Sequence, residues 1–135
     1  MQDPTELCVR VSQEIFGDAN VDLADELISV DFVDYEAPAG TPVGPESIKR
    51  TVRWIHASIG DITYHVDDSF GEGDRVALRM TMSGRHDGEL MGRPATGRRF
   101  SVNQIHIFRI TDSKIAEHWA ARDDAGMMRQ LGFLD

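Results

Sequence analysis

The chain has 135 residues, 41% of them hydrophobic and 27% charged, and a formal net charge of −9. This length and composition predict a single globular domain over residues 1–135 with a real apolar core. The negative charge argues against nucleic acid and anionic membrane surfaces as partners, because both are bound through basic faces. No apolar run approaches the roughly 20 residues of a membrane span. With no export signal expected at the N-terminus and a single cysteine, Cys8, we expect a cytoplasmic protein.

Helical signals dominate the first 60 residues. Asp3 followed by Pro4 is typical of an N-cap and a first helical residue, and the apolar stripe behind them predicts a helix that ends near Gly17. The other elements expected here are a short helix after Asn20, a short strand at 32–35, a loop at 37–44 and a helix from Pro45.

After Gly60 the apolar period changes from helical spacing to alternation. Strands are expected at 62–66, 76–82, 100–110 and from 115 onward, with turns at 71–74 and 111–114 and a polar loop at 86–97. Helices followed by an antiparallel meander predict an α+β fold with N-terminal helices packed on a curved antiparallel sheet. A sheet that curls around helices leaves a cavity, and apolar cavities are the usual small-molecule sites.

The passage from Lys114 to Gly132 gives the most specific functional signal. Ile115, Trp119 and Ala121 share one face of the expected strand, and Asp123 falls on that same face. Burial of a carboxyl group favours its neutral form and can make it an acid/base group near neutral pH. We therefore expect Asp123 to be the catalytic group. The alternative is that Asp123 only caps the helix that follows.

Other polar and aromatic side chains are expected to converge on the cavity with Asp123. His106 is the second catalytic candidate, and the expected substrate-binding residues are Gln104, Tyr35, Trp54, Met80, His86 and Trp119. Structural alternatives are a satisfied sheet histidine for His106, a solvent-side loop for His86, core packing for Tyr35 and Trp119, and a cross-strand ion pair between Arg109 and Glu117.

The inward face of residues 100–110 is ambiguous. Strict alternation groups Gln104 with His106, but Ile105 and Ile107 favour the opposite face. A bulge near Asn103 would reconcile the two apolar sets.

A set of segments spread over most of the chain carries a family resemblance: Asp31–Tyr35, Gly44–Glu46, Gly73–Ala77, Gly84–Gly92, Thr96–Gly97, His106–Arg109 and Lys114–Gly132. They resemble the SnoaL-like polyketide cyclases, the ester cyclase branch of the NTF2-like superfamily. The resemblance implies a cone-shaped α+β barrel of the cystatin-like type, a homodimer, a deep pocket and no cofactor. It also implies an aspartate at the end of the last strand, here Asp123, that does acid/base work in an intramolecular aldol ring closure. Gln104 and His106 would orient the substrate.

The sequence thus predicts an enzyme that cyclises a small apolar or polyketide-like molecule through Asp123. Asp123→Asn is expected to abolish turnover and to leave the fold intact. The five histidines are scattered without the spacing of a ligand set, so no metal site is expected. An isomerase or hydrolase with the same pocket, and a non-catalytic protein that binds a small molecule, are the alternatives.

Overall fold

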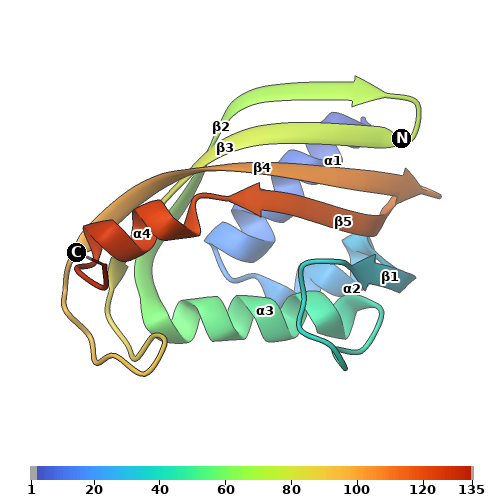
Figure 1. The fold of residues 1–135 in the computed structure, drawn as a ribbon. Helices are drawn as coiled ribbons and strands as arrows, with labels where there is room; N and C mark the ends of the chain where they lie inside the picture. The colour runs from blue at the N-terminus through green and yellow to red at the C-terminus, as the bar shows by residue number, and fades with distance from the viewer. Residues whose placement is uncertain (1–2, 135) are drawn as a thin grey trace.

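The computed structural model describes residues 3–134, so the expectation for the extreme N-terminus, at Met1 and Gln2, lies outside the described residues. Four α-helices, two other helical turns and five strands follow one another (Figure 1). Their bounds are α1 Pro4–Arg10, the π-helix η1 Val11–Gly17, the 3-10 helix η2 Val21–Leu23, α2 Ala24–Leu27, β1 Ile28–Asp34, α3 Pro45–Ser58, β2 Ile59–Glu72, β3 Arg75–His86, β4 Arg99–Thr111, β5 Lys114–Arg122 and α4 Asp124–Gln130.

The first helix begins where the sequence predicts. The Asp3 carboxylate accepts a hydrogen bond from the Glu6 backbone N–H at 3.2 Å, and Pro4 opens the first turn. The helical path continues through η1 and ends at Gly17, as expected. Cys8 is fully buried, and burial together with the charge of Asp3 raises the pKa of its thiol to about 12. This cysteine therefore packs the core and is not a nucleophile.

The strands form one sheet in the order β1-β5-β4-β3-β2. Strands β2 to β5 are the predicted antiparallel meander, whereas β1 pairs with β5 in parallel, which the sequence did not reveal. In Figure 1 the sheet bends over the helices, with α3 running beneath it and α1 behind. The predicted α+β class, with helices on a curved sheet, is confirmed.

Strand β4 alternates regularly between buried and exposed residues. In β4 burial alternates strictly from Phe100 to Phe108, with Gln104 and His106 on the buried face. The predicted bulge near Asn103 is wrong: β3 and β4 pair without a register shift, and Ile105 and Ile107 stay 48% and 38% exposed on the outer face. Burial in β4 is thus decided by which face covers the helices, not by which residues are most apolar.

Strand β5 contains the bulge instead. Arg109 faces Glu117 while Ile110 faces Ile115, so Ala116 is an extra residue on β5. A one-residue insertion sends every later side chain to the opposite face of the sheet. His118, Ala120 and Arg122 therefore share the inner face that Ile115 occupies before the bulge. Trp119 and Ala121, which were predicted to share the face of Ile115, lie on the outer face.

The outer face of the sheet keeps the exposed Ile105 and Ile107 beside Ala77, which is opposite Ile107. The homodimer expected from the family resemblance would cover such a face, and it stays a prediction. Within residues 3–134 no helix is both long enough and apolar enough to cross a membrane.

Candidate active site

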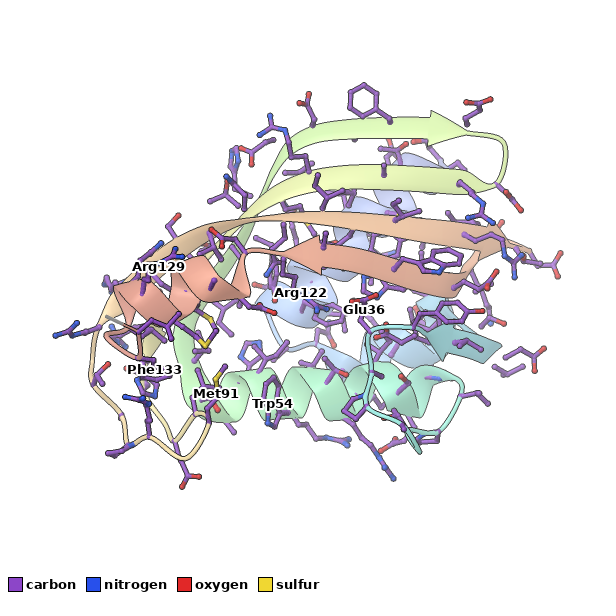
Figure 2. All side chains as sticks on the ribbon, in the orientation of Figure 1. Glu36, Trp54, Met91, Arg122, Arg129 and Phe133 are labelled. Carbon is purple, nitrogen blue, oxygen red and sulfur yellow. The ribbon has the colours of Figure 1, made fainter. Side chains whose placement is uncertain are left out.

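A cavity of about 530 Å³ lies between the curved sheet and the helices. This is within the usual size range of small-molecule sites. Met80, Met82, Ile115 and other apolar side chains form most of its wall. Figure 2 shows Glu36, Trp54, Met91 and Arg122 around the space between α3 and the end of β5, and all four line the cavity.

Four polar side chains form a continuous chain of hydrogen bonds along one wall of this cavity. His118 Nδ1 lies 2.9 Å from Asp34 Oδ1, and His118 Nε2 lies 2.8 Å from His106 Nδ1. At the other end His106 Nε2 lies 2.8 Å from Gln104 Oε1. All four residues line the cavity. We call Asp34, His118, His106 and Gln104 the relay.

Three neighbouring strands assemble the relay. The parallel pairing of β1 with β5 sets Asp34 opposite His118, and the bulge at Ala116 turns His118 inward. Alternation along β4 then sets His106 and Gln104 two residues apart on the same face. The imidazoles of His106 and His118 stack with centroids 5.1 Å apart, and Phe108 packs against both. The relay is therefore held by sheet register and by aromatic packing.

The hydrogen bonds of the relay fix its number of protons. Both ends are acceptors, a carboxylate and an amide oxygen, so three hydrogen bonds require three hydrogens on the two imidazoles. One imidazole is then neutral and the other is cationic, and the Asp34 carboxylate balances the charge. A reversed Gln104 amide would turn its oxygen toward the Met82 thioether, which lies 3.3 Å from the amide nitrogen and has no hydrogen to donate.

The electrostatics of the relay agree with this count. Burial favours the neutral form of Asp34, but the hydrogen bond and charge of His118, the Glu36 backbone N–H and the charge of Arg122 outweigh it and hold the pKa of Asp34 below its ordinary value. Burial, together with the charges of His118 and Arg122, lowers the pKa of His106 to about 3. His106 is therefore the neutral imidazole of this count.

His106 should make the stability of the protein depend on pH. A histidine with an ordinary pKa of 6.5 in the unfolded chain and about 3 in the folded one binds more protons when unfolded. The free energy of unfolding should therefore fall as pH decreases from about 6.5 toward 3, by about 1.4 kcal/mol per pH unit for this one group. Urea unfolding at several pH values measures this slope.

The matched variants for this slope are His106→Gln and His65→Gln. The first should remove the contribution of one proton from the slope. The second replaces a side chain that is 75% exposed and paired only with Asp67, and it should change the slope much less than His106→Gln does. Equal slopes in the wild type and His106→Gln would contradict a neutral buried His106.

The prediction that Asp123 is buried in the pocket is wrong. Asp123 is exposed, it is not among the residues that line the cavity, and its Oδ1 accepts a hydrogen bond of 2.8 Å from the Gly126 backbone N–H. It is the N-cap of α4, the alternative that the sequence left open. The cause is the bulge at Ala116, which moves Asp123 off the face that it would share with Ile115 in a regular strand.

Tyr35 and Trp119 were also expected at the pocket and lie outside it. Their rings stack on each other at 5.1 Å, and neither residue lines the cavity. The Tyr35 hydroxyl donates a hydrogen bond of 2.6 Å to Glu117, and the predicted cross-strand ion pair between Arg109 and Glu117 is present. Tyr35, Trp119, Arg109 and Glu117 therefore contact one another on the outer face of the sheet.

The remaining predicted residues divide between the pocket and the core. Gln104, Met80 and Trp54 line the cavity, with Trp54 63% exposed at its mouth. His86 does not line it and is not in a solvent-side loop either. It is completely buried, and its Nδ1 lies 3.0 Å from Thr96 Oγ1 and accepts the Thr96 backbone N–H. His86 therefore fixes the loop after β3.

The sequence alone did not single out Asp34, His118 or Arg122. Asp34 had a usable signal, because it is two residues after the buried Phe32 on a short strand and so shares its inward face. His118 and Arg122 had none, because their orientation depends on the bulge at Ala116.

Comparisons with known proteins find similarity to one family over nearly the whole chain. The family model for the SnoaL-like polyketide cyclases matches residues 6–131. The chain is 35% identical over 127 residues to the aklanonic acid methyl ester cyclase DnrD of Streptomyces peucetius, covering 92% of this chain and 88% of the relative.

Two further relatives extend the comparison. Identity to the nogalonic acid methyl ester cyclase of Streptomyces nogalater is 35% over 122 residues, covering 87% and 89% of the two chains. The solved structure of TsrD from Streptomyces laurentii matches with a TM-score of 0.86 at 32% identity, over 96% of this chain and 94% of TsrD. The chain therefore belongs to the SnoaL-like polyketide cyclase family.

Proposed function

We propose that this protein is a cyclase that closes a ring in a polyketide-like methyl ester by an intramolecular aldol reaction, with the relay as its acid and base. The observation that carries this proposal is that one hydrogen-bonded chain holds a carboxylate and two imidazoles inside an apolar cavity. The relatives act on methyl esters of aklanonic and nogalonic acid, as their names state, and these supply the substrate class.

Asp34 is suited to be the base. Its Oδ1 accepts hydrogen bonds from His118 and from the Glu36 backbone N–H, whereas its Oδ2 has no hydrogen-bond partner within residues 3–134. The side chain is only 4% exposed yet lines the cavity. A carboxylate that is ionised, shielded from bulk water and without a hydrogen bond on one oxygen can take a proton from a substrate carbon in the cavity that it lines.

His106 is suited to be the acid. In the first step a proton moves from the carbon beside the substrate carbonyl to Asp34, which leaves an enolate. The enolate carbon then bonds to the acceptor carbonyl carbon. The resulting alkoxide replaces Gln104 Oε1 as the acceptor of the His106 Nε2 hydrogen and takes that proton, which is resupplied through His118. Transfer of the proton from Asp34 to His118 restores the relay. No atom is gained or lost, so product and substrate have the same mass.

Two contributions would set the rate enhancement of ring closure. Acid/base assistance of this kind supplies about 10²–10⁴ in rate. Folding the two reacting carbons together in one pose can supply about 7–11 kcal/mol more. The cavity walls formed by Met80, Met82 and Phe108 would hold that pose.

The test is incubation of the purified protein with aklanonic acid methyl ester and with nogalonic acid methyl ester. We expect at least one ester to convert to a product of the same mass and different chromatographic retention, much faster than in protein-free solution. Conversion of neither ester above that background would contradict the proposed substrate class.

A further inference from the structure

Arg122 stands at the inner rim of the cavity, next to the relay. It is the last residue of β5 and the register partner of Gln104, so the two side chains are neighbours on the same face of the sheet. Its side chain is 31% exposed and lines the cavity. In Figure 2 it lies at the end of β5 above Trp54.

The ion pair of Arg122 is incomplete. Its Nη1 lies 3.9 Å from Glu36 Oε1, which is longer than a hydrogen bond, and it has no other salt-bridge partner within residues 3–134. The other arginine that lines the cavity, Arg50, is 61% exposed and lies 3.7 Å from Glu46 on α3. Arg122 is the arginine whose charge acts on both Asp34 and His106, beside that of His118. Within residues 3–134 its guanidinium donors make no hydrogen bond, and the side chain lines the cavity.

In the proposed reaction such a cation would stabilise negative charge on the substrate. Proton removal beside a carbonyl creates a negative oxygen, and an apolar cavity offers little to stabilise it except a fixed positive group. A guanidinium stabilises this charge well, because it is always protonated and presents several donors in one plane. Glu36 would hold Arg122 in position in the empty protein and give way to a substrate oxygen.

We infer that Arg122 binds an anionic oxygen of the substrate, an enolate or a phenolate conjugated to a planar ring, and so makes the site select acidic dicarbonyl or phenolic compounds over neutral ketones of the same shape. This inference rests on the proposed function, since it assumes that the cavity holds the reacting molecule. The titratable and charged residues that line the cavity together with Arg122 are Asp34, Glu36, Arg50, Tyr64, His106, His118 and Asp124.

A pair of dyes tests this without turnover. 2-Hydroxyanthraquinone changes its absorption when its phenol ionises, and 2-methylanthraquinone has similar shape without an ionisable group. We expect the wild type to lower the pKa of the bound phenol by at least about one pH unit, equivalent to a tenfold preference for the anion. In Arg122→Gln this shift should disappear, while affinity for the neutral dye changes less than threefold. Arg122→Lys should keep part of the shift.

Arg129→Gln is the matched control, because it removes the same charge from an exposed side chain on α4 that does not line the cavity (Figure 2). It should keep the wild-type shift. An equal shift in the wild type and Arg122→Gln would overturn the inference alone. Failure of both dyes to bind the wild type would contradict an aromatic-binding cavity, and so the proposed function as well as the inference.

Discussion

Asp34→Asn is expected to lower the rate of ring closure by about 10²–10⁴-fold, the usual contribution of a positioned acid/base group. Asparagine has the same shape as aspartate, and its amide oxygen can still accept the His118 hydrogen bond of 2.9 Å. The relay geometry should therefore survive while its proton acceptor is lost. Steady-state kinetics on the converted methyl ester measure the rate, and circular dichroism checks the fold.

Asp123→Asn is the natural control for that experiment. The sequence alone predicts that this substitution abolishes turnover, but the structure shows an exposed N-cap that is outside the cavity lining. Because asparagine caps helices as well as aspartate does, the variant should keep both stability and rate. A large loss in Asp123→Asn together with normal turnover in Asp34→Asn would return the catalytic role to the end of β5.

His118→Phe is expected to destabilise the protein by about 3–5 kcal/mol at neutral pH, the usual cost of leaving one member of a buried ion pair without its partner. The side chains of Asp34 and His118 are only 4% and 6% exposed, so water cannot replace the lost hydrogen bond. Phenylalanine fills the imidazole site between Phe108 and His106 without supplying a charge. Urea unfolding at pH 7 measures the loss.

The pH dependence of this loss identifies its cause. Without His118 the pKa of Asp34 should rise above its unfolded value of 3.8, so the deficit is full at neutral pH and shrinks as the pH falls and Asp34 takes up a proton. Asp34→Leu combined with His118→Phe should recover much of the loss, and His65→Phe, at an exposed site, should cost little. A deficit that does not change with pH or with the second substitution would mean that His118 acts only by packing.

Much of the fold could be predicted because its signals are local. The Asp3 and Pro4 start of α1, the apolar stripe of α3 and the alternation in β2 to β4 each lie within a few residues of one another. Alternation alone also places Gln104 and His106 on one face of β4.

The candidate site was harder to predict from the sequence than the fold, because it depends on two non-local features. The bulge at Ala116 exchanges the faces of β5, which brings His118 and Arg122 inward and leaves Trp119 and Asp123 outside. The parallel pairing of β1 with β5 joins Asp34 to His118 across 84 positions in sequence. Neither feature has a residue pattern of its own here, so a regular strand placed Asp123 in the cavity, which Asp34 lines instead.

Hydrogen–deuterium exchange at the reacting carbon tests most directly whether Asp34 removes a substrate proton. An analogue of the methyl ester without the acceptor ketone cannot cyclise, so in heavy water it reports proton removal alone. Rapid, protein-dependent uptake of deuterium by the wild type and none above background by Asp34→Asn is the result we predict. Uptake at the same rate in both proteins would contradict the proposal that Asp34 is the base.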